Sequence, residues 1–345
     1  LLADPGHISP DYGMANQSMC WYGTYQPLSG QSSCVETSPG YYVESRAATL
    51  QTPCSEGTYQ NSTERSYCLD SDPGYYVDSE GSTFQTPCPE GTYNPENSSN
   101  SLSDCRLADP GYFVSNIAST KQYPCEKGTF QPNSGQSGCV LAEPGYYVDV
   151  NGSSNQIPCG LGTYNPNYGS TAPEICTLAY PGYFVPTEAS DSQFPCPAGS
   201  YQPNFGEFSC RLASLGHYVE NIGSTSQNPA DLDNYVDFEG GTYQIPCPNL
   251  HITLNQASNA EDSCLLDSDS DRDPDIDDTD DDNDGVLDQN DFCNPGVTGW
   301  TSGLVTDDDG DGCRDEDEDL DDDNDGVEDA ADWAPLDSSE SRDSD

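Results

Sequence analysis

The aspartates toward the C-terminal end of the chain are spaced as in calcium-binding loops. In such a twelve-residue loop, side chains at positions 1, 3, 5, 9 and 12 and the carbonyl of position 7 supply oxygens, and glycine at position 6 permits a sharp turn. Oxygen-only ligands favour Ca²⁺ over zinc or copper. Three stretches predict Ca²⁺ ligands in this register: Asp280, Asp282, Asp284, Val286, Asp288 and Asp291; Asp307, Asp309, Asp311, Cys313, Asp315 and Glu318; and Asp321, Asp323, Asp325, Val327, Asp329 and Asp332.

A weaker loop precedes these three, because Arg272 occupies its glycine position. Its candidate ligands are Asp267, Asp269, Asp271, Asp273, Asp275 and Asp278. At the other end, residues 342–345 resemble the opening of a further loop.

Charge is concentrated in the same segment. Residues 265–345 hold 33 acidic residues and three arginines, which is more than half of the formal net charge of −52. A run of this density can be a disordered, solvated tail, but the regular spacing favours calcium loops. Without the ion, each close carboxylate pair would repel by about 4 kcal/mol at an effective dielectric near 20. We therefore expect the segment to be disordered when metal-free.

Cysteines recur along the rest of the chain with a fixed spacing. Five pairs, from Cys34 and Cys54 to Cys176 and Cys196, are each twenty residues apart. Around them recur PGYYV, QxPC and GTYQP or GTYNP, in units of 34 or 37 residues. Units of this size cannot build a sufficient apolar core, so the cysteines indicate disulfides formed in an oxidising compartment. This predicts an extracellular or cell-surface protein.

One break in the repeat indicates which cysteines pair. Ala230 stands twenty residues after Cys210, where the other units have a cysteine, and residues 231–247 repeat a half-unit. Pairing across twenty residues would leave Cys20 and Cys210 without partners, whereas pairing around GTY matches every cysteine. The predicted disulfides are Cys20–Cys34, Cys54–Cys68, Cys88–Cys105, Cys125–Cys139, Cys159–Cys176, Cys196–Cys210 and Cys247–Cys264. Each closes a loop whose closure contributes roughly 3 kcal/mol.

The elements that carry these residues are expected to be short strands and turns. PG opens a turn, Tyr-Tyr-Val and Thr-Tyr-Gln favour strands, and proline before cysteine limits pairing to an edge. The tyrosines are expected to pack around the disulfides. From Cys54 onward the cysteine loops alternate between spacings of 14 and 17, which indicates either regularly placed contact loops or drift after duplication.

The predicted fold class is therefore small disulfide-rich all-β tandem repeats that form an elongated rod, followed by irregular calcium-wrapped Asp loops. Residues 1–264 would form seven tandem repeats with a half-unit insertion at about 231–247, and residues 265–345 the Asp-rich repeats. The chain starts and stops inside repeated motifs, so we expect it to be a segment of a longer protein.

Two family resemblances follow from these motifs. The CxxGTYxP and PGYYV elements of residues 1–264 resemble the cysteine-rich repeats of the ephrin-receptor-like family, which implies extracellular spacing or recognition and no catalysis. The Asp loops of about 267–345, interrupted at residues 291–295 and 311–313, resemble thrombospondin type 3 repeats. That resemblance implies a chain wrapped around a row of calcium ions, with Cys293 joined to Cys313.

The sequence favours a structural function, as a cell-surface stalk or an extracellular filament subunit that associates with itself or a neighbouring surface protein. The alternative is an adhesin or receptor ectodomain that binds a protein or glycan. No catalytic constellation or phosphate loop is recognised, so an enzyme is not expected. The acidic surface disfavours nucleic acid, and no stretch is long and apolar enough for a membrane span. Sequons at Asn16, Asn61, Asn97 and Asn151 are candidate glycosylation sites.

Overall fold

The computed structural model describes residues 2–9 and 16–339, so the loop opening expected at residues 342–345 lies outside it. Within the described residues, secondary structure consists of fifteen two-stranded hairpins, with two residues in each strand, and three short 3₁₀ helices. No α-helix occurs in that part of the chain. The predicted all-β class is confirmed. None of the described helices could cross a membrane.

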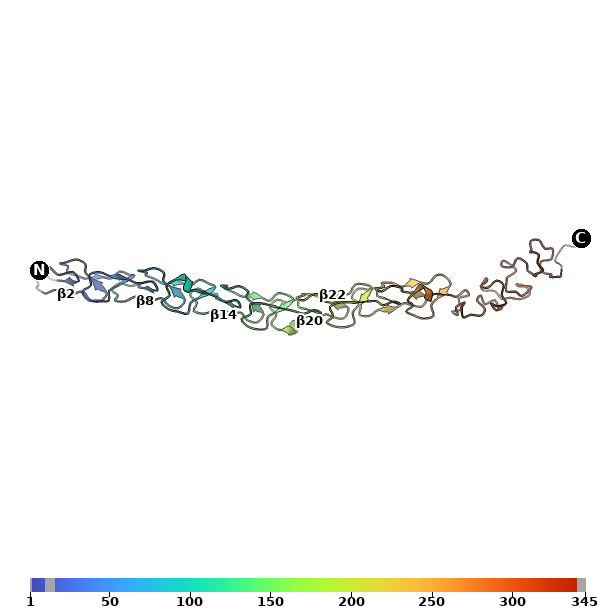
Figure 1. Ribbon diagram of the computed structural model, residues 1–345, viewed down its shortest axis with the longest axis horizontal. Coiled ribbons are helices and arrows are strands. Elements are labelled where there is room, and N and C mark those ends of the chain that lie inside the picture. Colours follow the sequence, from blue (N-terminus) through green and yellow to red (C-terminus); the bar gives the residue numbers. More distant parts are fainter. Residues whose placement is uncertain (1, 10–15, 340–345) are drawn as a thin grey trace. The chain divides into compact units, whose positions relative to one another are not determined.

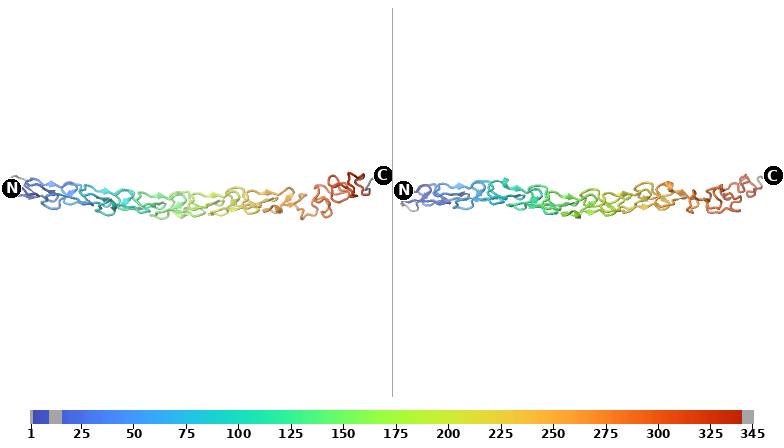
Figure 2. Two further views of the ribbon diagram at one scale, coloured as in Figure 1. Left: turned by 45° about the horizontal axis from the view of Figure 1, so that its top comes forward. Right: turned by 60° about the horizontal axis from the view of Figure 1, so that its bottom comes forward.

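The chain divides into two compact units. Unit 1 comprises Leu1–Thr177 and Thr187–Ser192, and unit 2 comprises Leu178–Pro186 and Gln193–Asp345. Within each unit the hairpins follow one another in chain order, as the sequence of colours shows in Figure 1 and in the two turned views of Figure 2.

The hairpins are of two kinds, and both are built around a tight turn. In seven of them, called disulfide hairpins here, a cysteine lies three residues before the residue of the turn that has a positive φ. Their strands are β3 (Thr24–Tyr25) and β4 (Val35–Glu36), β7 (Thr58–Tyr59) and β8 (Leu69–Asp70), β11 (Thr92–Tyr93) and β12 (Arg106–Leu107), β15 (Thr129–Phe130) and β16 (Val140–Leu141), β19 (Thr163–Tyr164) and β20 (Thr177–Leu178), β23 (Ser200–Tyr201) and β24 (Arg211–Leu212), and β29 (His251–Ile252) and β30 (Leu265–Leu266).

The other eight hairpins carry a glutamine where the disulfide hairpins carry their second cysteine, and are called glutamine hairpins. Their strands are β1 (His7–Ile8) and β2 (Ser18–Met19), β5 (Tyr41–Tyr42) and β6 (Thr52–Pro53), β9 (Tyr75–Tyr76) and β10 (Thr86–Pro87), β13 (Tyr112–Phe113) and β14 (Tyr123–Pro124), β17 (Tyr146–Tyr147) and β18 (Ile157–Pro158), β21 (Tyr183–Phe184) and β22 (Phe194–Pro195), β25 (His217–Tyr218) and β26 (Asn228–Pro229), and β27 (Asn234–Tyr235) and β28 (Ile245–Pro246).

All sixteen cysteines form disulfides, and the predicted pairing is confirmed. The bonds are Cys20–Cys34, Cys54–Cys68, Cys88–Cys105, Cys125–Cys139, Cys159–Cys176, Cys196–Cys210, Cys247–Cys264 and Cys293–Cys313. The first seven close disulfide hairpins. The last joins two parts of the Asp-rich segment, as the resemblance to thrombospondin type 3 repeats implied.

The glutamine hairpins are closed by a hydrogen-bonded staple in place of the disulfide. The Gln85 side-chain carbonyl accepts the backbone N–H of Asp72 at 2.7 Å, and its amide donates to the Asp72 carboxylate at 2.7 Å. Gln122 makes the same two bonds to Asp109. Gln51, Gln193 and Gln227 make only the bond to the backbone N–H. These contacts fix the ends of the loop without a covalent bond. The sequence analysis did not foresee this role for the glutamine of QxPC.

The side chains buried in the hairpins are small or amidic. In the glutamine hairpins a valine after the first strand is buried, as at Val77 and Val114, together with a small residue before the turn, as at Ala108. The tyrosines expected to pack around the disulfides, such as Tyr41 and Tyr59, are only half-buried. Some aromatic residues pair across their own hairpin instead, as Phe113 and Tyr123 do at 6.2 Å between ring centroids.

The identity of the buried polar side chain in a disulfide hairpin follows the length of its loop. Hairpins with a cysteine spacing of 14 have glutamine, and Gln60 donates across the loop to the carbonyl of Tyr67 at 2.9 Å. Hairpins with a cysteine spacing of 17 have asparagine or threonine at this position. In one of them, the Asn94 amide donates to the Ser99 hydroxyl at 2.8 Å. Each longer loop also contains a 3₁₀ helix: η1 (Leu102–Asp104), η2 (Pro173–Ile175) and η3 (Glu261–Ser263).

Successive hairpins are linked through the turn glycines. Gly40 has a φ of +88°, and its N–H donates at 2.7 Å to the carbonyl of Gln60 in the next hairpin. A Cβ at Gly40 would overlap the carbonyl oxygen of Gly81, which belongs to the second hairpin along the chain. Glycine is therefore needed for both the backbone conformation and the close approach.

Residues 231–247 form a complete glutamine hairpin, β27–β28, directly after another one, β25–β26. Ala230 is fully buried in the position that Ala213 takes in the preceding hairpin. A second glutamine hairpin needs a small residue there and not a cysteine. At its turn, Asp233 replaces glycine with a φ of +64°.

We predict that Gly40→Ala lowers the free energy of unfolding by about 2 to 4 kcal/mol, because it combines an unfavourable φ with overpacking. Urea denaturation with the disulfides intact measures the change. Gly138→Ala is the control, since a Cβ added at Gly138 would meet no atom within 4 Å and its φ is not positive. Equal midpoints for the two variants would contradict the stacking role of Gly40.

Candidate metal centres in the Asp-rich segment

Four loops of the Asp-rich segment share one hydrogen-bond pattern. Loop 1 is residues 267–278, loop 2 is 280–291, loop 3 is 307–318 and loop 4 is 321–332. In each, the N–H of position 6 donates to the carboxylate of position 1: Arg272 to Asp267, Gly285 to Asp280, Gly312 to Asp307 and Gly326 to Asp321, at 2.9 to 3.2 Å. Loop 1 therefore folds like the others, with Arg272 at a φ of +80° in place of glycine.

The position 9 aspartates close the loops. Their carboxylates accept the N–H of position 2: Ser268 to Asp275, Asp281 to Asp288, Asp308 to Asp315 and Asp322 to Asp329, at 2.8 to 3.2 Å. The carboxylate of position 5 likewise accepts the N–H of position 7, from Asp273, Val286, Cys313 and Val327. A ligand role for the position 7 carbonyls and for position 9 stays a prediction.

The structure brings the carboxylates of positions 1, 3 and 5 together in every loop. The ligand atoms in each of the following clusters lie within 4.8 Å of one another: Asp267, Asp269 and Asp271; Asp280, Asp282 and Asp284; Asp307, Asp309 and Asp311; and Asp321, Asp323 and Asp325. Each could hold a metal ion. A fifth cluster unites Asp315 with Asp319 and Asp322, which the sequence analysis did not select.

The predicted position 12 ligands are not in these clusters. Asp291 accepts the N–H of Cys293, Asp332 that of Ala334 and Glu318 that of Val297. Asp278 of loop 1 accepts the N–H of Thr279. Positions 1, 3 and 5 are thus the groups that the fold itself assembles.

Several of the assembled carboxylates are buried without a partner. Asp267, Asp282, Asp284 and Asp323 are 5% exposed or less, and one oxygen of each has no hydrogen-bond partner among the described residues. An unpaired buried carboxylate oxygen is costly, and a cation removes that cost. The hard oxygen donors fit Ca²⁺.

The pKa values of the clustered carboxyl groups also favour a bound cation. Burial, with repulsion from Asp284 second, raises the pKa of Asp282 to about 6. Burial, with repulsion from Asp311 second, raises the pKa of Asp309 to about 6. Burial raises the pKa of Asp284 as well. These carboxyl groups are therefore held in an environment that disfavours their own charge until a counter-charge arrives.

Adjacent loops are connected by asparagines that the sequence analysis missed. The Asn283 amide of loop 2 donates to the Asp269 carboxylate of loop 1. Asn324 of loop 4 donates in the same way to Asp309 and Asp311 of loop 3. The signal was present, because only loops 2 and 4 have asparagine at position 4.

A comparison with known protein families finds a match in part of the hairpin region. Residues 182–229 match the family model described as tyrosine-protein kinase ephrin type A/B receptor-like. These residues include the hairpins β21–β22, β23–β24 and β25–β26. No curated protein matches the chain. The disulfides and this match together suggest an extracellular or cell-surface ectodomain.

We predict that calcium binding weakens as the pH falls below about 6, up to about tenfold per pH unit for each proton displaced. In the metal-free chain the pKa values of Asp282 and Asp309 are raised from 3.8 to about 6 by folding. Protonation of these two groups therefore stabilises the folded loops fully below pH 3.8, and this stabilisation is lost as the pH rises through about 6. Calorimetric titration with calcium in two buffers of different ionisation enthalpy measures the protons released. An affinity that stays constant from pH 7.5 to 5 would contradict the proposed ligands.

Proposed function

We propose that the protein is an extracellular structural protein whose disulfide-closed hairpins and calcium-filled Asp loops form a stiff rod. The rod would serve as a cell-surface stalk or as the subunit of an extracellular filament. The observation that carries the calcium part of this proposal is the set of buried, unpartnered carboxylate oxygens, which recurs in loops 1, 2 and 4.

Two features of the hairpins support a structural role. Within each unit, most hairpins hydrogen-bond to their successor through equivalent atoms, as Gly57 does to Val77 and Gly74 does to Asn94. The contacts are also local along the chain, with the next hairpin or the one after it, as in proteins built from stacked repeats. Partners would be further copies of the chain or a neighbouring surface protein.

The proposal includes no catalytic step, because the repeated residues offer no recognisable combination of nucleophile, base and orienting group. A nucleic-acid partner is disfavoured by the net charge of −52. The sequons fit an extracellular protein that carries glycans.

A second candidate function is recognition of a protein or glycan. Two cavities in unit 1 favour it, because they lie in equivalent positions of the longer loops. One of about 400 Å³ is lined by residues that include Asn97, Asn100 and Arg106. The other, of about 420 Å³, is lined by residues that include Tyr168 and Glu174. Polar groups in such cavities are suited to hydrogen-bonding a sugar or peptide.

We predict that calcium protects the Asp-rich segment from proteolysis. Limited digestion with an Asp- or Glu-directed protease should leave residues 267–339 intact in millimolar calcium and cleave them after chelation, while the hairpins resist in both conditions because the disulfides persist. Magnesium at equal concentration is the control, since it demands a smaller octahedral site. Identical digestion with calcium and with chelator would contradict the proposal.

Electron microscopy separates the two structural roles. A filament subunit should give periodic polymers in calcium that fray after chelation. A stalk should give single particles in which chelation changes only the acidic end. Recognition would be favoured instead if the particles bind a surface glycan or protein and if altering the two cavities abolishes that binding.

A further inference from the structure

Two residues that break their own repeats meet each other in unit 2. Asp233 stands at a hairpin turn where glycine occupies most of the equivalent positions, and Arg272 stands where loops 2, 3 and 4 have glycine. Both have a positive φ, +64° and +80°, a conformation that is unfavourable for most residues with a side chain and tolerated better by aspartate than by arginine. Their side chains form an ion pair at 2.6 Å. The two exceptions to their repeats therefore meet in one contact.

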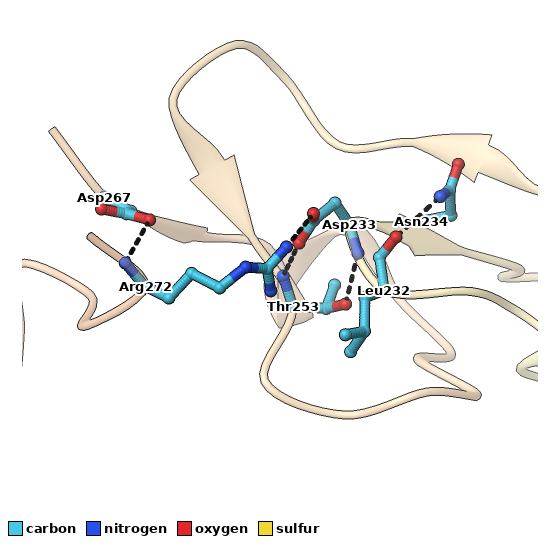
Figure 3. Close-up of polar contacts among 6 residues, drawn as sticks. All are labelled: Leu232, Asp233, Asn234, Thr253, Asp267 and Arg272. Atoms are coloured by element: carbon cyan, nitrogen blue, oxygen red, sulfur yellow. Dashed lines mark hydrogen bonds and ion pairs between the residues drawn. The ribbon is translucent and has the colours of Figure 1, made fainter. Parts of the chain in front are cut away.

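A third exception completes the contact. Thr253 is 1% exposed and takes the place of the buried glutamine or asparagine of the other disulfide hairpins. Its hydroxyl accepts the Asp233 N–H at 2.8 Å, and its own N–H donates to the Asp233 carboxylate at 3.3 Å. Figure 3 shows the Asp233 carboxylate bonded to both the Arg272 guanidinium and the Thr253 backbone.

The other end of Arg272 belongs to a candidate cation site. Its N–H donates to one carboxylate oxygen of Asp267 at 3.2 Å, while the second oxygen of Asp267 is buried with no partner among the described residues. The N–H of Asp267 donates to the carbonyl of Leu250 at 2.8 Å, as Ala108 does to Gly91 in a regular disulfide hairpin. Asp267 therefore ends the last hairpin and begins loop 1.

We propose that Arg272 is a positioning residue that transmits cation binding in loop 1 to the hairpins formed by residues 231–266. A cation held by Asp267, Asp269 and Asp271 would fix the loop backbone, and the fixed backbone would hold the guanidinium on Asp233. The Asp233 turn and its bonds to Thr253 would then become more stable. This inference rests on the proposed calcium binding.

The alternative role for Arg272, an internal counter-charge that replaces the cation, fits the structure less well. The guanidinium pairs with Asp233, outside the loop 1 cluster, and it is the backbone N–H that contacts Asp267. Arg314 of loop 3 differs, because it pairs with Asp317 of its own loop. The two arginines therefore provide a matched comparison.

Hydrogen exchange of the full chain, with and without calcium, tests the proposal in the wild type and in Arg272→Gln, Asp233→Gly and Arg314→Gln. In the wild type we expect calcium to slow exchange in residues 232–236 and 251–254 by about two- to fivefold, the factor for a half-exposed ion pair. Arg272→Gln and Asp233→Gly should abolish that slowing while calcium still slows exchange in loop 1. Arg314→Gln should retain it, and Arg272→Lys should restore part of it.

Two results would overturn the inference alone: calcium-dependent slowing at residues 232–236 that survives in Arg272→Gln, or its absence from the wild type although loop 1 responds to calcium. A wild type in which calcium slows exchange nowhere in residues 267–332 would overturn the proposed calcium binding itself. The two failures are therefore distinguishable in one data set.

Discussion

Strands of two residues are too short to hold a hairpin closed, so each hairpin of this chain depends on a link across its loop. Two chemistries provide that link: a disulfide, as in Cys54–Cys68, and a glutamine staple, as between Gln85 and Asp72. With the loops closed, a valine, an alanine or an amide suffices to fill each small interior. The turn glycines can then pass hydrogen bonds from one hairpin to the next. Alternating the two links halves the number of cysteines the stack requires.

In the Asp-rich segment the corresponding constraint is charge. The backbone N–H groups of each loop gather the carboxylates of positions 1, 3 and 5 within 4.8 Å, and some of their oxygens are buried. The Cys293–Cys313 disulfide and the asparagines at position 4 of loops 2 and 4 hold neighbouring loops together. None of these contacts supplies the positive charge that the clusters lack, and we propose that calcium does.

Features that recur with the repeat could be predicted from the sequence. Contacts between side chains of different repeats could not. The cysteine pairs and Asp clusters were predicted because their spacing recurs. The disulfide pairing followed because the other pairing would have left Cys20 and Cys210 without partners. The glutamine staple was missed because its partner, such as Asp72 for Gln85, is thirteen residues away and looks like ordinary turn sequence. The cluster of Asp315, Asp319 and Asp322 joins two loops, and Asp233 meets Arg272 over 39 residues. Such contacts between repeats have no period of their own.

The most direct test of the central claim is a crystal structure of the full chain grown in calcium, with anomalous diffraction measured to locate the ions. We expect an anomalous peak at the position 1, 3 and 5 carboxylates of each loop, with Asp282 and Asp284 among the ligands of loop 2. Clusters that keep the same geometry in millimolar calcium but show no peak would contradict it.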